Sequence, residues 1–303
     1  MRTALTQSAG ARALLTLVLL AVSVLLTRTA SADTLLGIEF DTGTLYTINP
    51  ATAAVTKLGS TGIAGMADIQ FSPNGTLYGF STSLQAVPSL YTINPQTAVA
   101  TDVGALGIGL ISEGGLAFGP DGTAYAVNNV LSATGVRQLF TINLSTGIAT
   151  VVASLGIYDF NGLAYRNDGM LVGIDSLSNS IDTIDPVKGV VTSLAVLPFA
   201  LGSVGGLTTL DGTSYLATAG SLVGQGSDSL YTVNLFTGAT SLVGSFSPTF
   251  FDVGLSGIAG EPSSTPVPEP RGLPLLAVAL PLLTLVLRRA TSTIRRTDSH
   301  RNP

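Results

Sequence analysis

A string of about six residues occurs five times along this chain, and this repetition constrains the fold more than any other feature. In the string Leu-Tyr-Thr-Ile-Asn-Pro, Leu and Thr alternate with Tyr and Ile, so both faces of such a strand are largely apolar, as in sheets packed on both sides. The copies begin at Leu45, Leu90, Leu139, Ile181 and Leu230. From Tyr46 to Tyr231 the spacing averages about 46 residues, which is near the length of a four-stranded propeller blade.

Two further elements accompany the string in each unit. A Gly-x-Ala element precedes it and leads into a tight turn, which predicts a β-hairpin because Gly, Asn and Asp tolerate positive φ. A Gly turn and a Val/Leu-rich strand follow it. The turns before the string are Asn74-Gly75, Asp121-Gly122, Asp168-Gly169 and Asp211-Gly212, and those after it include Thr146-Gly147, Lys188-Gly189 and Thr237-Gly238. Each unit therefore reads as four short antiparallel strands.

The ends of the repeat region predict how the array closes. Five units of this length fill residues 33–260 and leave no room for a sixth. Residues 34–37 align with the second strand of a unit, and Gly257-Ile258-Ala259 offers the missing first strand. Pairing the two ends would remove the unpaired edges of an open array. The sequence thus predicts an all-β fold, a five-bladed propeller that resembles NHL/YVTN-like repeats, with a β-solenoid or a six-bladed ring as alternatives.

The composition of residues 33–270 limits the partners of this body. That segment holds four basic residues against seventeen acidic ones, a formal charge of −13, and the chain has no Cys. Nucleic acids and anionic lipids bind to positively charged protein surfaces, so neither is expected as a partner. Without Cys, disulfides and thiolate metal sites are also excluded.

The N-terminus reads as an export signal. Arg2 and Arg12 form a positive region, residues 13–26 an apolar one, and Ala30-Ser31-Ala32 a small-residue cleavage site. Residues 1–32 are therefore predicted to be a signal peptide, with the mature chain starting at Asp33. A retained N-terminal anchor is the alternative.

The C-terminus reads as a sorting tail. A Pro/Ser/Thr-containing spacer at 261–266 precedes Val267-Pro268-Glu269-Pro270, an apolar run at 272–287, and Arg288-Arg289. As a helix the run is about 24 Å long, slightly short of a bilayer core of about 30 Å. The arginines place the basic tail at 290–303 in the cytoplasm.

This order of parts resembles the PEP-CTERM sorting signal. The resemblance implies an exosortase-type membrane enzyme as a partner, a transient membrane helix, and a final location at the cell surface or outside the cell. It also implies an association with bacteria that produce exopolysaccharide. The alternative is an uncleaved single-span anchor.

The sequence offers few candidates for catalytic residues. The single His, His300, lies in the tail, which excludes a Ser-His-Asp triad and a His metal cluster in the mature body. Asp182 and Asp185 are three apart on one predicted strand, so they point to opposite faces. The Asp-Gly turns lack the D-x-D-x-D-G pattern of acidic residues that a calcium-binding loop has, although calcium binding by one of these aspartates remains an alternative. We therefore predict no catalytic residue, no metal site and no cofactor.

The loops between the second and third strands vary most among the units. They are long at residues 81–89, 127–138 and 219–229, and all should lie on one rim. Arg137 and Asp228 lie in two of them and are the candidate binding residues. The sequence favours a non-enzymatic surface or matrix module that binds exopolysaccharide or protein; the alternative is an exported hydrolase or lyase that acts on matrix polysaccharide through acidic residues.

Overall fold

The computed structural model describes residues 34–109, 111–129, 137–199, 203–219, 229–246 and 255–261. The predicted signal peptide, the spacer after residue 261, the sorting motif, the apolar run and Asp228 lie outside these ranges. Within these ranges, we find no candidate for a membrane-spanning helix.

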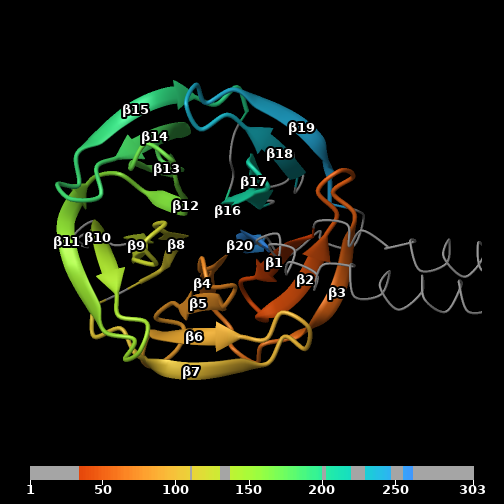
Figure 1. The fold of residues 1–303 in the computed structure, drawn as a ribbon, viewed down its shortest axis with the longest axis vertical. Helices are drawn as coiled ribbons and strands as arrows, with labels where there is room; N and C mark the ends of the chain where they lie inside the picture. The colour runs from red at the N-terminus through yellow and green to blue at the C-terminus, as the bar shows by residue number, and fades with distance from the viewer. Residues whose placement is uncertain are drawn as a thin grey trace, which may run out of the picture. The chain divides into compact units, whose positions relative to one another are not determined.

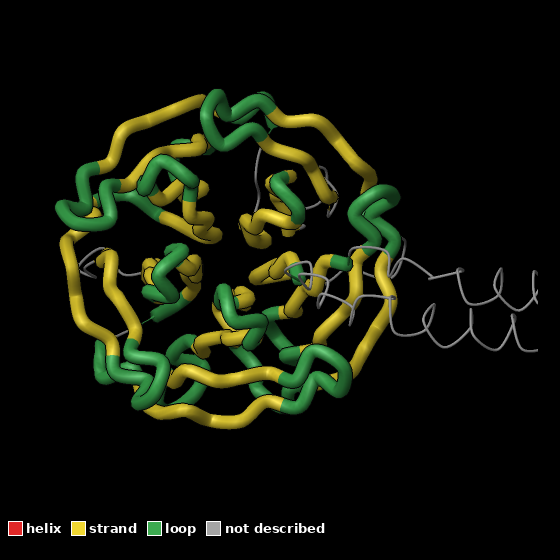
Figure 2. Tube along the Cα trace, viewed as in Figure 1, coloured by secondary structure: helices red, strands yellow, loops and turns green. Residues whose placement is uncertain are grey.

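The described residues form twenty β-strands and no helix (Figures 1 and 2). The strands are short because each unit alternates apolar strand residues with Gly, Asn and Asp turns. Their bounds are β1 Leu35–Glu39, β2 Thr44–Ile48, β3 Val55–Ser60, β4 Met66–Phe71, β5 Leu77–Ser81, β6 Ser89–Ile93, β7 Ala100–Ala105, β8 Glu113–Phe118, β9 Ala124–Asn129, β10 Arg137–Ile142, β11 Ala149–Gly156, β12 Phe160–Tyr165, β13 Leu171–Asp175, β14 Ser180–Ile184, β15 Val191–Val196, β16 Ser203–Leu210, β17 Thr213–Ala219, β18 Ser229–Val233, β19 Thr240–Ser245 and β20 Leu255–Gly260.

These strands make five antiparallel sheets of four, which we call blades. Blade 1 has the order β20-β1-β2-β3, and blades 2 to 5 hold β4–β7, β8–β11, β12–β15 and β16–β19. The innermost strands contact one another in the cycle β20, β4, β8, β12, β16 and back to β20, so the blades close into a ring (Figure 1). The prediction of a five-bladed β-propeller is confirmed.

Blade 1 is completed by the two ends of the ring. β20 pairs with β1 in antiparallel register, with Leu35 opposite Gly260 and Gly37 opposite Ile258. The Ser256 hydroxyl donates a hydrogen bond of 2.6 Å to the carbonyl of Met66 in the next blade. The predicted pairing of the terminal strands is therefore confirmed, and it leaves no open edge on the inner side of β1.

The core lies between neighbouring blades. Strands such as β1, β4, β13 and β14 are buried along their whole length, whereas the outer strands β3, β7, β15 and β19 alternate half-buried with exposed residues. This gradient explains why the repeated string is apolar on both faces: its strand is sandwiched between two adjoining blades.

The repeated glycines let the inner strands approach each other. A Cβ on Gly115 would lie 2.8 Å from backbone atoms of Gly162, and one on Gly162 would lie 3.0 Å from the backbone nitrogen of Leu207. Side chains do not fit at such separations. The Gly-x-Ala element therefore marks the closest contacts around the axis.

Asp68 ties three inner strands together in this crowded region. Its carboxylate is fully buried and accepts the backbone N–H of Ile69 at 2.8 Å and that of Leu116, on β8, at 2.7 Å. Its Oδ1 also occupies the space that a Cβ on Gly257 of β20 would fill. Burial raises the pKa of Asp68 well above its usual range, and the two N–H donors offset part of that effect.

The ring has two different rims. On one, which we call the turn rim, lie the hairpin turns between the first and second strands and between the third and fourth strands of each blade. On the other, the loop rim, lie the connections between second and third strands and those from one blade to the next. Of the three long loops, the structure describes only residues 81–89 in full, and this loop lies on the loop rim, as predicted; residues 130–136 and 220–228 lie outside the described ranges.

Candidate binding site

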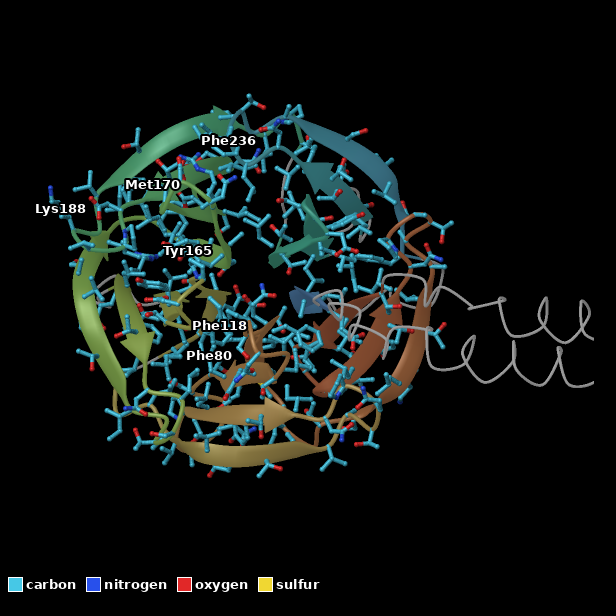
Figure 3. The ribbon with its side chains drawn as sticks, in the orientation of Figure 1. Phe80, Phe118, Tyr165, Met170, Lys188 and Phe236 are labelled. Carbon is cyan, nitrogen blue, oxygen red and sulfur yellow. The ribbon has the colours of Figure 1, made fainter. Side chains whose placement is uncertain are left out.

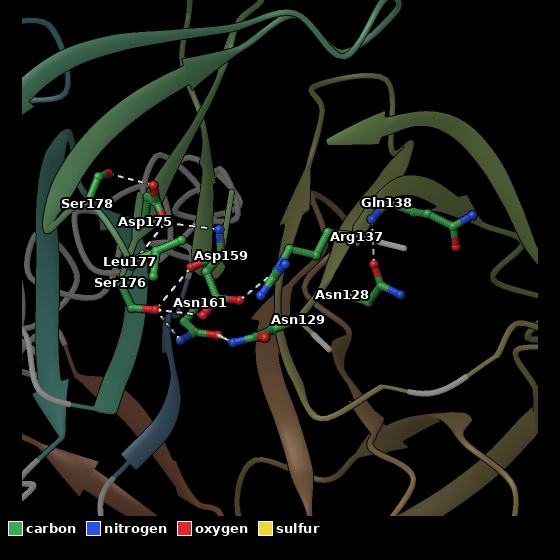
Figure 4. A network of polar contacts seen from close by, with 10 residues as sticks. All are labelled: Asn128, Asn129, Arg137, Gln138, Asp159, Asn161, Asp175, Ser176, Leu177 and Ser178. Carbon is green, nitrogen blue, oxygen red and sulfur yellow. Dashed lines mark hydrogen bonds and ion pairs between the residues drawn. The ribbon is translucent and has the colours of Figure 1, made fainter. Parts of the chain in front are cut away.

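Polar side chains gather on the loop rim where blades 3 and 4 meet, and Figure 4 shows all of those named below except Glu113. We call them the polar cluster: Glu113, Asn129, Arg137, Asp159 and Asn161. Each stands at a strand end. Glu113 is the first residue of β8, Asn129 the last of β9 and Arg137 the first of β10, while Asp159 and Asn161 flank the first residue of β12. The antiparallel order of the two blades therefore brings these five positions to one rim.

Arg137 forms an ion pair with Asp159 across the blade boundary. Its Nε lies 3.0 Å from Asp159 Oδ1, and both side chains are less than one-fifth exposed. The Ser176 hydroxyl donates to Asp159 Oδ2 at 3.2 Å, and the Asp159 N–H donates to Asp175 Oδ1 at 2.9 Å. The carboxylate that faces Arg137 is thus fixed by blade 4, which orients the guanidinium.

A pair of buried asparagines lies beside this ion pair. Asn129 Nδ2 donates to Asn161 Oδ1 at 3.1 Å, and both residues are less than 5% exposed. Asn129 Oδ1 is buried and accepts no hydrogen bond from any residue that the structure describes. A buried carbonyl oxygen without a donor costs about 1–3 kcal/mol, so native proteins rarely leave one unsatisfied without a reason.

Glu113 carries the titratable group of the cluster. Burial, and then the negative charge of Asp159, raise its pKa to about 7, while a hydrogen bond from Asn161 works in the opposite direction. Near neutral pH the Glu113 carboxyl is therefore present in both forms. It donates a hydrogen bond when protonated and only accepts when ionised.

Together these groups offer donors and acceptors to a polar ligand. Asn129 Oδ1 accepts, Glu113 donates or accepts, and Arg137 brings the one positive charge of the cluster. Within the described parts of the chain, no three His, Cys, Asp or Glu side chains gather as metal ligands. The arrangement suits hydrogen bonding to hydroxyl groups better than capture of a single strongly charged group, because its own charges are largely paired.

Of the two predicted binding residues, the structure describes Arg137 alone. The prediction that it lies in a long loop is wrong, because β10 begins at Arg137 and its side chain is held by Asp159. Asp228 lies outside the described residues, as do Ala30, Ala32, Asp33, Arg288, Arg289 and the motif from Val267 to Pro270. Whether Arg137 binds a ligand stays a prediction.

The acidic pair Asp182 and Asp185 also needs correction. They were predicted to share a strand, but β14 ends at Ile184. Asp185 instead accepts the backbone N–H groups of Val187 and Lys188 in the following turn, at 2.8 and 3.0 Å. Asp182 is fully buried and faces Ser180, whose hydroxyl donates to it at 2.8 Å.

Sequence reasoning missed Glu113, Asn129, Asp159 and Asn161. A weak signal was present: Glu113 and Asn161 each directly precede a glycine near the start of an inner strand, where apolar residues would be expected. The sequence pattern could not predict the hydrogen bond between Asn129 and Asn161, because these residues come from different blades.

Similarity to known proteins is found among solved structures alone. No family model matches the chain, and no curated protein matches it in sequence. Among solved structures, a chain of a nidogen–laminin complex aligns over 75% of this chain and 98% of its own, with 12% identity and a TM-score of 0.46. TolB from Acinetobacter baumannii aligns over 69% and 52% at 15% identity and a TM-score of 0.43.

A third similar structure is the PQQ-bound aldose sugar dehydrogenase from Streptomyces coelicolor. It aligns over 69% of this chain and 77% of its own, with 17% identity and a TM-score of 0.48. Similarities of this size carry no information about ligands or activity. The class of this protein, a five-bladed β-propeller, follows from its own sheets and their closure.

Proposed function

We propose that the chain is an exported β-propeller of the cell surface or extracellular matrix, which binds exopolysaccharide or a surface protein and catalyses no reaction. Three features of the sequence support export and sorting: the signal-like segment before Asp33, the Pro-Glu-Pro motif, and the apolar run that ends in Arg288-Arg289. The acidic body supports a partner other than nucleic acid.

The observation that carries the binding proposal is the unsatisfied carbonyl oxygen of Asn129. It is buried beside Glu113, whose carboxyl lies near its own pKa at neutral pH, and beside the Arg137–Asp159 ion pair. A saccharide hydroxyl would accept from the guanidinium of Arg137, whose side chain is 19% exposed, and would donate to the buried Asn129 Oδ1 once the side chains that cover this atom move aside. Among the two proposed partners, this chemistry favours the polysaccharide.

Export and sorting are tested by the mass of the surface form. Intact-mass measurement should give a chain that begins at Asp33 and ends close to the Pro-Glu-Pro motif, after handling by an exosortase-type enzyme and transient residence in the inner membrane. A surface species that still contains residues 288–303 would contradict sorting and leave a plain membrane anchor.

Binding is tested by co-sedimentation of the full chain with exopolysaccharide from the source organism. Replacing Arg137 by Ala should weaken the apparent affinity by about tenfold or more, since a hydrogen bond to a charged group contributes about 1.5–3 kcal/mol. Lys188→Ala is the matched control, because it removes a positive charge from an exposed turn on the opposite rim. Equal affinity of wild type and Arg137→Ala would contradict a site at the polar cluster.

A second candidate function has one specific observation in its favour. Glu113, with its raised pKa, lies close enough to Asp159 for the two carboxyls to interact, and a protonated carboxyl beside an ionised one is the general arrangement of polysaccharide hydrolases. Release of reducing ends from the same polysaccharide would support this function. Abolition of that release in Glu113→Gln would assign it to the polar cluster, and co-sedimentation without release supports the non-enzymatic proposal.

A further inference from the structure

A pocket of about 600 Å³ opens on the turn rim, between blades 4 and 5. Its lining comes from Tyr165 at the end of β12 and the turn that follows in blade 4, and from β16, β17, β18, β19 and the turns between them in blade 5. This volume lies within the range of about 300–1,000 Å³ that small-molecule sites occupy. Because the chain is built from repeats, the other blades show what occupies the corresponding positions elsewhere.

The inner strand of a blade ends in an aromatic residue in three of the repeats. Phe71, Phe118 and Tyr165 hold this position, and the register of β16 with β17 places Thr209 there in blade 5. Thr209 pairs with Ser214 as Tyr165 pairs with Leu171. Blade 5 therefore has a small hydroxyl side chain where blades 2, 3 and 4 have a ring, while the inner strand of blade 1 ends in Gly260.

The partner of that ring is missing as well. Between blades 2 and 3, Tyr78 packs on Phe118 with ring centroids 5.7 Å apart, and between blades 3 and 4, Tyr125 stacks on Tyr165 at 6.0 Å. The residue of blade 4 that corresponds to Tyr78 and Tyr125 is Val172. Two rings are thus replaced by small side chains at the boundary where the pocket opens.

A ring appears instead at the mouth of the pocket. Phe236 lies in the turn after β18 and is 53% exposed (Figure 3). The corresponding residues of the other repeats are Ala51, Gln96, Ser145 and Val187. The turn itself does not require an aromatic residue, because its backbone is held by the side chain of Asn234.

Arg166 supports this ring from blade 4. Its Cζ lies 4.6 Å from the centroid of the Phe236 ring, and its Nη1 donates to the Leu235 carbonyl at 3.0 Å. Its Nε and Nη2 donate to Asp168 at 2.8 and 2.6 Å. The guanidinium therefore fixes the ring, and its charge is balanced by a carboxylate. The corresponding residues in blades 2 and 3 are Ser72 and Gly119.

We infer that this pocket is a binding site for an uncharged sugar ring. Arg166 is the only charged residue in the lining, and its pairing with Asp168 leaves no charge for an ionic ligand. Hydroxyl groups of Thr209, Ser214 and Ser241 line the pocket; Thr209 and Ser214 bond to each other at 3.0 Å, and their remaining capacity and the Ser241 hydroxyl are left for a ligand. A sugar combines hydroxyl edges with an apolar C–H face, and the exposed Phe236 ring suits that face.

The inference does not depend on the proposed function, because this pocket and the polar cluster lie on opposite rims. Departures from the repeat occur elsewhere too, but here three of them meet: Thr209, Arg166 and Phe236. An empty gap left by drift would not explain why a large ring is added and braced at its mouth.

The test is saturation-transfer NMR of the full chain with glucose, galactose, mannose, maltose and cellobiose, followed by titration with any sugar that binds. Phe236→Ser should weaken binding by about tenfold, as expected for an aromatic contact of roughly 1.4 kcal/mol. Thr209→Tyr should abolish it by restoring the ring that fills the corresponding space in blade 4, with the melting temperature kept.

Val187→Ser is the matched control, since Val187 occupies the Phe236 position in blade 4 and is exposed. It should leave binding unchanged. Binding that both Phe236→Ser and Thr209→Tyr weaken, and the control does not, supports the inference. Absence of binding to all five sugars, or binding that the two variants leave intact, overturns it.

Discussion

The two rims of this ring are stabilised in different ways. On the turn rim, side chains such as Asn143 bond to backbone groups two or three residues ahead, so each turn is satisfied within its own hairpin. On the loop rim, Arg137 and Asn129 bond to residues 22 and 32 positions away in the next blade. The comparison teaches that the turns themselves are stabilised within each blade, whereas blades are joined by the loop rim, the inner strands and, on the turn rim, single side chains such as Arg166. Changes that break contacts between blades should therefore cost more than changes within a turn.

The largest effect is expected from removal of β20. A chain that ends at residue 251 loses the strand that closes blade 1 and contacts β4 and β16. Domains of this kind have only about 5–15 kcal/mol of stability, so cooperative thermal unfolding should disappear. Calorimetry measures this, with a chain that ends at Glu261 as the control. A shared melting temperature of the two chains would show that the ring does not need β20.

Replacement of Asp68 by Ala comes next. It leaves the buried N–H of Leu116 without an acceptor and should lower the free energy of unfolding by about 2–4 kcal/mol. Denaturant titration measures the loss, and Asp102→Ala, an exposed carboxylate on the outer strand β7, is the control. If the two variants were equally stable, the contact between β4 and β8 would contribute nothing beyond a surface charge.

The third effect depends on pH and reports on the polar cluster. The pKa of Glu113 is raised in the folded state from 4.5 to about 7, so the folded state keeps a proton that the unfolded state releases. Its contribution to stability is complete below about pH 4.5 and is lost as the pH rises to about 7, a change of up to about 3 kcal/mol.

Glu113→Gln, which cannot ionise, isolates this contribution. The stability of wild type minus that of the variant should fall between pH 4.5 and pH 7.5, as measured by denaturant titration at each pH. A difference that stays constant across this interval would contradict burial of the Glu113 carboxyl beside Asp159.

The smallest effect is expected on the turn rim. Asn143→Ala removes the acceptor of the Ser145 and Thr146 N–H groups, which lie in an exposed turn where water replaces it. The loss should be about 0.5–1.5 kcal/mol. The exposed Thr150→Ala on β11 serves as the control in thermal unfolding. A loss as large as that of Asp68→Ala would remove the distinction between contacts within and between blades.

The sequence predicted the turn rim and the blades well because their signals are local. The Asn-Gly and Asp-Gly turns, the repeated strand and even the pairing of β20 with β1 follow from short strings that recur at one spacing. The same locality explains the error at Asp185: its side chain bonds to the turn that follows, which ends the strand one residue earlier than the pattern indicated.

Contacts between blades were much harder to predict. Arg137 was singled out because basic residues are rare in this body, but its partner Asp159 could not be named, since both an ion pair and a solvated side chain fit the same sequence. Asp68 resembles any polar residue of a strand until Leu116, 48 residues later, is placed beside it. Thr209 and Phe236 can be recognised as departures from the repeat only when the strand register shows which residues of the other blades hold the same positions.

The pairing of β1 with β20 also sets an order of events in folding. Residues 35–39 are made first, but their inner neighbour, residues 255–260, is made last. A chain that emerges from its amino end must therefore hold an incomplete first blade until nearly the whole ring has followed. Contacts so distant in sequence form slowly. Blades 2 to 5 can assemble during emergence, but blade 1 is completed in one late step, and until then the exposed edge of β1 is the place where the chain is open to mispairing.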